Sequence, residues 1–474
     1  MRPCETERGA QRTQYVTTFV RLWALAHLIH VWRQAAPSGI MSPEVLAPWG
    51  WVVLGAAAAV FYRPHSALRL GLLALCQITA AIATGPHIAN HWLLAALVNT
   101  ALVIALLEAR KEEPTARVSF AVSRFEGTAR SLFLITYAAA ALSKLNTGFL
   151  DPKLSCAATF AGGFLAPFGS ELPVAATMIA ISLTMALELA IPLLLCVRRT
   201  RVVGICVAGS FHLVLALAPP LMPFDFTALL FALLVLFAPS SAIERAASPG
   251  STAAPLVWLR AAARGRERMA WALGAMVAAI LIGFRGAIIP TAIWTATTTI
   301  LAALALGSLL LSFLKAARGE GLGGAGALKC LPANVLYGCL LGVALITAAA
   351  PYVGLHTAPT FTMFSNLRTE LGETNHLFLP RAELFNLQDQ RVEIIHSDDP
   401  ALAPAAESGL LLHEVEVWRR HKRNPDETTR IRRIVGGAGG ELMSPSDLST
   451  PPMLVRIFFA FRPAPARGDP ACRW

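Results

Sequence analysis

One stretch decides how the chain is read: TARSLFLITYAAAALSKLNTGFLDP, from Thr128 to Pro152. Its apolar part has the length of a membrane helix, about 18 residues. The run contains a tyrosine, Tyr137, and ends in a lysine, Lys144, where the hydrocarbon should stop. Two hypotheses explain the lysine. Either its ammonium snorkels to the membrane interface, or it lies beside a pocket as an amine base that burial keeps neutral.

The rest of the chain supports a membrane setting. It is 55% hydrophobic and 15% charged, with a mean hydropathy of +0.56, which excludes an ordinary water-soluble domain for most of its length. Apolar runs recur as far as residue 350, and the composition then becomes polar. We therefore predict a membrane domain over residues 1–351 and a folded tail domain over residues 352–474.

Eleven apolar runs have a length suited to membrane helices. They cover about residues 16–32, 45–62, 67–83, 91–107, 128–145, 173–197, 202–218, 221–238, 269–284, 288–314 and 333–350. Several are short, so that a neighbouring pair could form one re-entrant element. The expected fold class is an all-α polytopic membrane domain of about eleven transmembrane helices with a small C-terminal extracytoplasmic α+β domain.

The net charge of +11 is spread through short loops, which indicates a topology signal and no nucleic-acid partner. With the N-terminus counted as loop zero, the lysines and arginines concentrate in the even-numbered loops, whereas the odd-numbered loops hold Arg33, Lys153 and Arg285. This alternation predicts a multi-pass protein integral to the plasma (inner) membrane, with a cytoplasmic N-terminus and an extracytoplasmic C-terminal domain. Lys144 would then lie at the outer face.

The cysteines show no CxxC or other metal-binding spacing, and no metal is expected. Cys156 and Cys472 are the two placed for an oxidising compartment, and a disulfide between them is one hypothesis. Trp23, His27 and His30 share one face of the first helix; with no carboxylate or third ligand at suitable spacing, we favour polar packing between helices over a ligand pair.

The loop over residues 146–172 contains the apolar, glycine-rich sequence FAGGFLAPFG. It either dips back into the membrane as a lid over Lys144 or lies flat at the interface.

In the tail, residues 392–397, 428–435 and 453–461 have the composition of strands, and residues 409–423 have helical spacing. Directly after the last span come five polar residues that either form a cluster at the membrane surface, linking the tail to the helices, or belong to a solvated linker. They are Asn366, Arg368, Glu370, Asn375 and His376.

Four motifs together resemble one family over roughly residues 15–240. TYAAAALSKLNTGF resembles a helix end in vitamin K-dependent γ-glutamyl carboxylase and in the bacterial horizontally transferred transmembrane domain (HTTM) proteins. Asn90 and His91 match an Asn-His at the start of a membrane helix in that family. Glu188, ahead of a basic turn, matches an acidic position, and His212, after a phenylalanine, matches a Phe-His.

The resemblance implies a quinol-dependent carboxylase or oxygenase that acts at the extracytoplasmic face. In the carboxylase, the lysine that Lys144 matches is understood to deprotonate vitamin K hydroquinone; oxygen then converts the anion into a base strong enough to remove a γ-proton from glutamate, and carbon dioxide traps the carbanion. The implied catalytic residues are Lys144, His212 and Glu188, and the implied cofactor-binding residues are Tyr137, Asn90 and His91. An alternative role for these polar residues is interhelical hydrogen bonding.

The implied cofactor is reduced vitamin K or, more naturally here, a menaquinone-like quinol. The implied partners are the lipid bilayer, the quinone and an extracytoplasmic peptide or small acid. Two departures from the family matter: Ser143 stands where the carboxylase has a second lysine, and the tail is much shorter. A non-catalytic quinone- or lipid-binding membrane scaffold is therefore the alternative, and a transporter is less favoured because no inverted repeat is found.

Overall fold

The computed structural model describes residues 5–34, 43–166, 169, 171–218, 223–240, 243, 330, 332–382, 384–435 and 438–472. The chain forms two compact units, which are described separately below. The first comprises residues 1–80, 95–133 and 190–338, and the second comprises residues 81–94, 134–189 and 339–474. The second unit therefore contains the whole tail from residue 352 together with helical segments from earlier in the chain.

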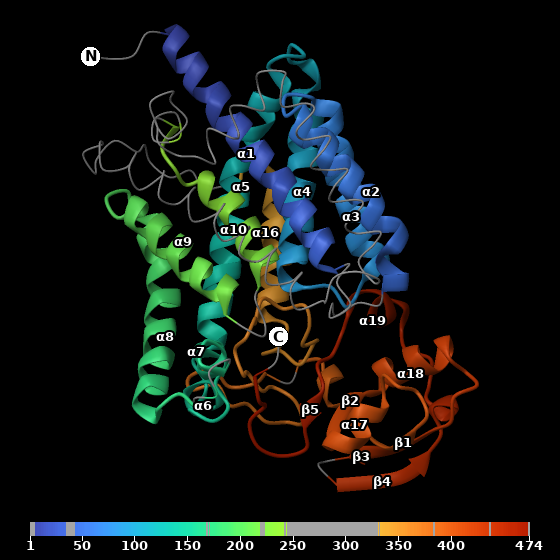
Figure 1. Cartoon of the computed structure of the whole chain (residues 1–474). Coiled ribbons are helices and arrows are strands. Elements are labelled where there is room, and N and C mark those ends of the chain that lie inside the picture. The colour runs from blue at the N-terminus through green and yellow to red at the C-terminus, as the bar shows by residue number, and fades with distance from the viewer. Residues whose placement is uncertain are drawn as a thin grey trace. The chain divides into compact units, whose positions relative to one another are not determined.

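Helices account for most of the elements before the tail, and several run from one unit into the other (Figure 1). Their bounds are α1 Glu5–Gln34, α2 Pro43–Tyr62, α3 Ala67–Thr84, α4 Asn90–Glu108, α5 Arg117–Ser143, α6 Thr147–Leu150, α7 Cys156–Gly163, α8 Val174–Cys196, α9 Arg201–Leu217, α10 Phe224–Val235 and α16 Val335–Ala349.

Among the described residues, three helical segments are long and apolar enough to cross a membrane: Ala67–Thr84, Asn90–Lys111 and Val174–Cys196. The apolar helices at Trp49–Tyr62, Arg201–Leu217, Phe224–Val235 and Val335–Ala349 are shorter. The expected count of eleven spans is thus not supported. Two of the expected spans, residues 269–284 and 288–314, lie outside the described residues.

The first half of α5 explains part of this difference. The helix begins at Arg117, well before the apolar run that the sequence suggested, and this added part carries Arg124, Glu126 and Arg130. These charges form ion pairs, Arg124 with Glu108 at 2.7 Å and Arg130 with Glu126 at 3.4 Å. A long helix with a charged, paired first half does not meet the composition of a membrane span.

In the first unit, α1 packs against α2 and α10, and α9 packs against α10. Trp23 and His27 of α1 both bond to the buried amide of Asn99 in α4, which also donates to Gln77 of α3. His30 lies 3.3 Å from the buried carboxylate of Asp225. Polar side chains of this face of α1 thus pack between helices, but the expectation that no carboxylate accompanies the histidines is wrong, because Asp225 lies beside His30.

The tail contains a five-stranded antiparallel sheet in the order β4-β3-β1-β2-β5 (Figure 1). Its strands are β1 Arg391–Ser397, β2 Leu410–His413, β3 Thr429–Val435, β4 Ala438–Met443 and β5 Ala464–Pro465. Val392 and Ile394 alternate into the core, where Val392 pairs with Leu412 and Ile394 with Ile431. The expected strands at 392–397 and 428–435 are confirmed.

Two tail predictions need correction. The expected helix over residues 409–423 starts only at Glu414 as α18 (Glu414–Arg423), because the preceding leucines pair with β1 and β5 as strand β2. The expected strand over 453–461 is wrong: residues Met453–Phe458 form helix α19. Pro451 and Pro452 precede it, and proline pre-sets the backbone angle of a helix start. A further helix, α17 (Ala403–Ser408), packs on β1 and β2.

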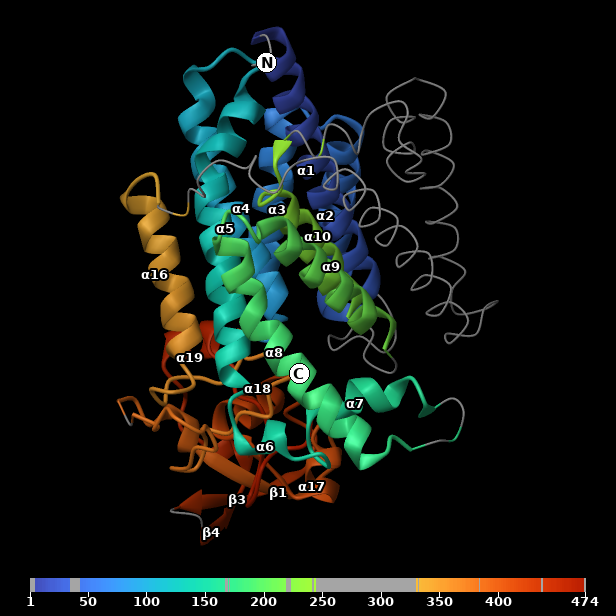
Figure 2. The same cartoon turned by 90° about the vertical axis from the view of Figure 1, so that its left-hand side faces the viewer.

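The disulfide between Cys156 and Cys472, which the sequence offered as one hypothesis, is present. It joins the first residue of α7 to a residue 316 positions later, beside a small apolar cluster that contains Phe149, Ala157 and Ile181. Figure 2 shows α6 and α7 close to the first turns of α8, in agreement with this cluster. The loop over 146–172 is thus largely folded as two short helices tied to the tail.

Candidate functional site

Lys144 lies inside the second unit, one residue beyond the end of α5. Its side chain is 5% exposed, and Nζ lies 2.8 Å from Oε2 of Glu188, whose side chain is 9% exposed. Glu188 lies in the middle of α8, an otherwise apolar helix. Removing one partner of such a buried pair leaves an uncompensated charge, at a cost of about 3–5 kcal/mol. The ammonium is paired within the protein, which favours the site hypothesis over the interfacial anchor.

Two backbone carbonyls complete the surroundings of the ammonium. Nζ donates to Met363 O at 2.9 Å and to Ala140 O at 3.3 Å. An ammonium has three donors, so the carboxylate and the two carbonyls give it a full set of partners. The ring of Phe149 adds a contact, with Nζ 5.9 Å from its centroid.

The last turn of α5 is closed by side chains around Lys144. The final carbonyls of a helix lack partners within the helix. Here Leu142 O receives Nε2 of His376 at 3.0 Å, and Ser143 O receives Nδ2 of Asn146 at 2.7 Å. Nζ of Lys144 itself donates to Ala140 O. Closing the helix end in this way fixes the position from which the lysine side chain starts.

Tyr137 is the third polar side chain near the pair. It precedes Lys144 by seven residues, two helical turns, and therefore lies on the same side of α5. Its side chain is 5% exposed, and it interacts electrostatically with Glu188. A hydroxyl, an amine and a carboxylate thus come together among apolar helices.

The segment that supplies the Met363 carbonyl has an unusual backbone. Phe361, Phe364 and Asn366 all have positive φ, at 59°, 50° and 55°. For non-glycine residues such conformations cost about 1–3 kcal/mol each and persist only where the surroundings impose them. Concentrated strain of this kind occurs at active sites and ligand clamps, so the segment is a functional candidate in its own right.

Asn90 holds this strained segment. Its Oδ1 accepts a hydrogen bond from the backbone N–H of Phe361 at 2.9 Å. Asn146 acts from the other side, because its Nδ2 donates to Ser365 O at 2.6 Å. Asn90 therefore acts on the site indirectly. It positions the strained segment, whose Met363 carbonyl accepts a hydrogen bond from Lys144.

The five polar residues after the last span are all buried, so the solvated-linker hypothesis is wrong. Asn375 bonds to Asn146, and Asn366 accepts from the N–H of Cys156 and donates to Leu154 O. Together with His376 they connect the tail to the end of α5 and to the loop that follows. The predicted link is confirmed for Asn366, Asn375 and His376.

His91 and His212 are the two remaining implied site residues. His91 is half-buried in the first turn of α4. His212 belongs to the first unit, where its buried ring contacts Phe211 and Phe226, each at 5.1 Å between ring centroids. Within the second unit, the structure brings Lys144 and Glu188 together with Tyr137 nearby, and connects Asn90 to them through the strained segment.

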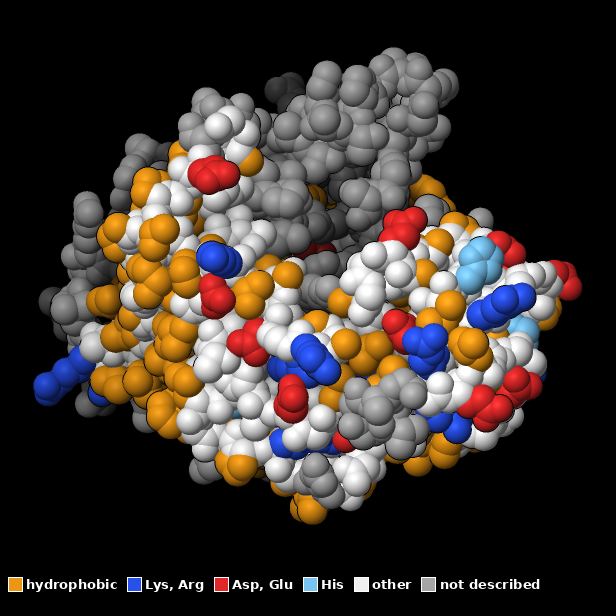
Figure 3. Space-filling model, turned by 90° about the horizontal axis from the view of Figure 1, so that it is seen from below, with side chains coloured by type: hydrophobic (Ala, Val, Ile, Leu, Met, Phe, Trp, Pro, Cys, Tyr) orange, Lys and Arg blue, Asp and Glu red, His pale blue; other side chains and the backbone are white. Residues whose placement is uncertain are grey.

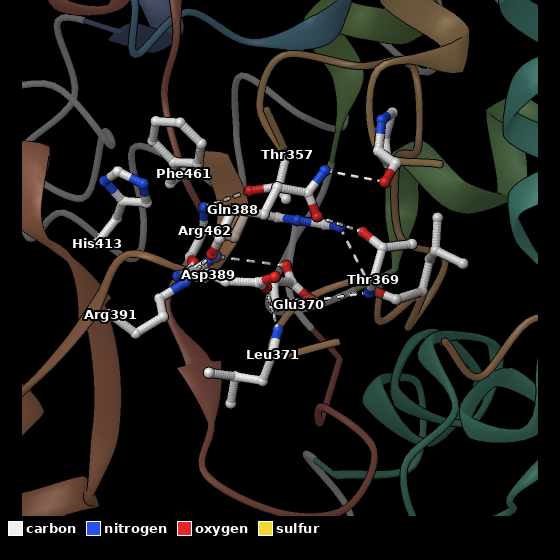
Figure 4. Close-up of polar contacts among 12 residues, drawn as sticks. Thr357, Thr369, Glu370, Leu371, Gln388, Asp389, Arg391, His413, Phe461 and Arg462 are labelled. Carbon is white, nitrogen blue, oxygen red and sulfur yellow. Dashed lines mark hydrogen bonds and ion pairs between the residues drawn. The ribbon is translucent and has the colours of Figure 1, made fainter. Parts of the chain in front are cut away.

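A second buried charged cluster lies in the tail around Arg391 (Figure 4). The Arg391 side chain is fully buried; Nε donates to Gln388 O at 2.7 Å, Nη1 to Arg462 O at 2.5 Å, and Nη2 lies 3.8 Å from Glu370. Burial lowers the pKa of this guanidinium, and the carboxylates of Glu370 and Asp389 oppose that effect. Every strong partner is a backbone carbonyl, which indicates a structural role.

His413 borders this cluster and caps α18. Its Nδ1 accepts from Val415 N at 3.1 Å, which leaves Nε2 as the donor to Leu387 O at 2.5 Å, and its ring stacks on Phe461 with centroids 3.6 Å apart. Burial, and then the charge of Arg391, lower the pKa of His413 from 6.5 to about 3. The imidazole is therefore neutral in the fold.

Sequence reasoning missed the partners that act through their backbone. Met363 contributes only its carbonyl, and no side-chain pattern marks that role. The nearest signal was the dense polar stretch after the last span, which begins three residues further on at Asn366. Comparison of the chain with protein-family models, with curated proteins and with solved structures found no match.

Proposed function

We propose that the protein is a membrane enzyme that takes a proton from a lipid-soluble quinol at the extracytoplasmic face, with Lys144 as the base. The observation that carries the proposal is the buried Lys144–Glu188 pair at 2.8 Å in an apolar setting. A buried amine beside a buried carboxylate in an apolar setting is the arrangement of groups that proton transfer requires. By resemblance, the overall reaction is a quinol-dependent carboxylation or oxygenation of a peptide or small acid.

The residues present fit a quinol by the chemistry of their donors. A bound quinol would supply two electrons and two hydroxyl protons. Tyr137 offers a hydroxyl for orienting a quinol oxygen, and Lys144, once neutral, offers a lone pair for its proton. Because Nζ lies 2.8 Å from a Glu188 oxygen, Glu188 is the nearest acceptor for a proton that the amine gives up.

This pairing also bears on the departure from the carboxylase pattern. Where the carboxylase has a second lysine, Ser143 turns back and donates to Ala140 O at 2.9 Å. A neighbouring cation is thus absent from that position, and the partner of Lys144 is a carboxylate. In the proposed reaction Glu188 is accordingly the proton acceptor behind the base.

The extracytoplasmic placement rests on two independent supports. The loop cations alternate in the manner of the positive-inside rule. The Cys156–Cys472 disulfide lies in the same unit as Lys144, and disulfides persist in oxidising compartments. Both favour the outer face for the lysine end of α5.

The second candidate is a non-catalytic scaffold that binds a quinone or lipid. One observation favours it: every donor of the Lys144 ammonium already has a partner within the protein. In that case the lysine ties α5, α8 and the strained segment together and does no chemistry.

Lys144→Arg separates the two functions. Arginine keeps the charge but cannot give up its proton, so a catalytic lysine predicts that both Lys144→Arg and Lys144→Ala lower oxygen-dependent oxidation of reduced menaquinone by about 10²–10⁴-fold. The rate is followed optically on purified protein in mild detergent, with size-exclusion profiles as the check on folding. Lys153→Arg, at an exposed lysine, is the matched control.

A Lys144→Arg protein that oxidises the quinol at the wild-type rate would end the catalytic proposal. Mass spectrometry of quinones that copurify with both proteins would then show whether the scaffold still binds its ligand.

A further inference from the structure

A pocket of about 590 Å³ opens in the second unit, and neither Lys144 nor Glu188 lines it. Its wall includes Thr147, Arg368, Glu373, Asn375 and Asp469. The size falls within the range of small-molecule sites, roughly 300–1,000 Å³. The proposed function of Lys144 assigns no ligand to it.

Arg368 is the cation of this pocket and is held in place by the protein. Its side chain is 3% exposed, its Nη1 donates to Gly468 O, and its backbone N–H donates to Asn375 Oδ1 at 2.8 Å. Nη2 lies 2.7 Å from Glu373. Nε is buried and has no hydrogen-bond partner in the part of the chain that the structure describes.

Glu373 contacts Nη2 of Arg368 and leaves Nε without a partner, so it engages one of the two donors in the guanidinium fork formed by Nε and Nη2. A carboxylate that binds a guanidinium side-on engages Nε and Nη2 together. Glu373 reaches Nη2 alone, and its own side chain is 65% exposed, so it can leave at small cost. The fork is therefore shaped for a carboxylate that fits better than the one the chain supplies.

Asp469 supplies negative charge on the same pocket wall. Its Oδ2 accepts from Thr147 Oγ1 at 2.7 Å, and its Oδ1 accepts from Asn375 Nδ2 at 3.0 Å. Gly148 allows this close packing, because a Cβ there would lie 3.1 Å from both Asn375 Nδ2 and Asp469 Cβ. A carboxylate oxygen has room for a further donor besides the one it holds.

We propose that this pocket binds a small zwitterion of the α-amino-acid type. The ligand carboxylate takes the Arg368 fork in place of Glu373, which moves out into solvent, and the ligand ammonium lies near Asp469. The proposal does not depend on the proposed function of Lys144, because neither Lys144 nor Glu188 lines the pocket and the groups that hold the ligand are Arg368 and Asp469.

The charges of the pocket select this class of ligand over an inorganic anion. One cation and two carboxylates line it, so a phosphate would meet net repulsion, whereas an ammonium on the ligand offsets one carboxylate. Seen from below, the described surface of the molecule likewise carries basic and acidic side chains next to one another (Figure 3).

The test is saturation-transfer NMR on the full-length protein in mild detergent, with L-alanine, propionate and inorganic phosphate as probes. L-alanine and propionate share a carbon skeleton and differ in the amine. We expect L-alanine to bind, propionate to bind more weakly, and phosphate not to displace L-alanine. Propionate binding as tightly as L-alanine, or displacement by phosphate, would overturn the assignment to a zwitterion.

Glu373→Gln tests the displacement step without touching the buried arginine. If Glu373 occupies the fork about nine-tenths of the time, its removal lowers the dissociation constant of L-alanine about tenfold. Glu407→Gln, at an exposed glutamate of α17, should leave binding unchanged. An unchanged affinity in Glu373→Gln, or an equal gain in Glu407→Gln, would sink the proposal.

Discussion

Lys144 and Arg391, two of the buried cations of the second unit, are held in different ways. Lys144 has one carboxylate at 2.8 Å, and in the proposed function it passes its proton to that group. Arg391 is also buried, but its guanidinium stays protonated. Its short hydrogen bonds go to the backbone carbonyls of Gln388 and Arg462. Burial alone therefore does not mark a reactive group; a nearby acceptor for the proton does.

The largest expected effect comes from a substitution beside Lys144. Glu188→Gln keeps the shape of the side chain but removes the group to which Lys144 would pass its proton, so quinol oxidation should fall by about 10²–10⁴-fold. Glu370→Gln is the matched change beside Arg391, and it should leave the oxidation rate unchanged while lowering thermal stability. Rates and unfolding midpoints of both proteins check this. Equal oxidation rates in the two variants would erase the distinction.

The next effect concerns the second site. Arg391→Lys keeps the charge but cannot reach both carbonyls at once, so we expect a loss of about 3–5 kcal/mol in the free energy of unfolding. Lys144→Arg, which also keeps its charge, should be much less destabilising because Glu188 still has a partner. Denaturant or thermal unfolding of the two variants measures the difference. Should Lys144→Arg prove the more destabilising, Lys144 would be the architectural cation.

The smallest effect is a pH dependence that belongs to the tail. The pKa of His413 is about 3 in the fold and 6.5 when exposed, so the unfolded chain binds more protons between these values and stability falls as pH drops through that window. For this one group the loss is about 2 kcal/mol at pH 5. His356 and His376, whose pKa values burial also lowers, act in the same direction.

A further loss is expected in stronger acid. Burial would raise the pKa of Glu416, but the hydrogen bond and charge of His87 and the charge of Arg419 outweigh it and lower the pKa from 4.5 to about 2. This contribution is present above pH 4.5 and is lost as pH falls toward 2. Thermal unfolding at pH 7, 5 and 4 tests the trend. His413→Gln should flatten the change between pH 7 and 5, and an unaltered slope would contradict the assignment to His413.

The sequence predicted those site residues whose side-chain type is unusual for its surroundings. A lysine at the end of an apolar run and a glutamate inside another must find partners when buried, and Lys144 and Glu188 find each other. Cys156 and Cys472 were likewise identified from the compartment that their positions suggested. Strands with clear alternation, such as residues 392–397, were equally readable.

Other features depend on contacts between distant residues and leave no local pattern. The strained segment has phenylalanine at two positions of positive φ, where glycine would have been the signal. Residues 453–461 have the composition of a strand, yet a proline pair at the start and burial of Val455 against Val415 and Phe461 make most of them a helix. The predicted number of membrane spans is not supported because several apolar runs form helices of fewer than 18 described residues, among them Arg201–Leu217 and Phe224–Val235.

The hydrogen bond from Lys144 to Met363 joins residues 219 positions apart, and this sets an order of assembly during synthesis. Glu188 follows Lys144 closely, so the ion pair can form while the ribosome is still far from residue 363. The strained segment can dock only later, when it arrives with the tail. Until then the lysine would be paired but incompletely enclosed, and a nascent chain stalled before residue 363 would expose this intermediate to labelling by an amine-reactive probe.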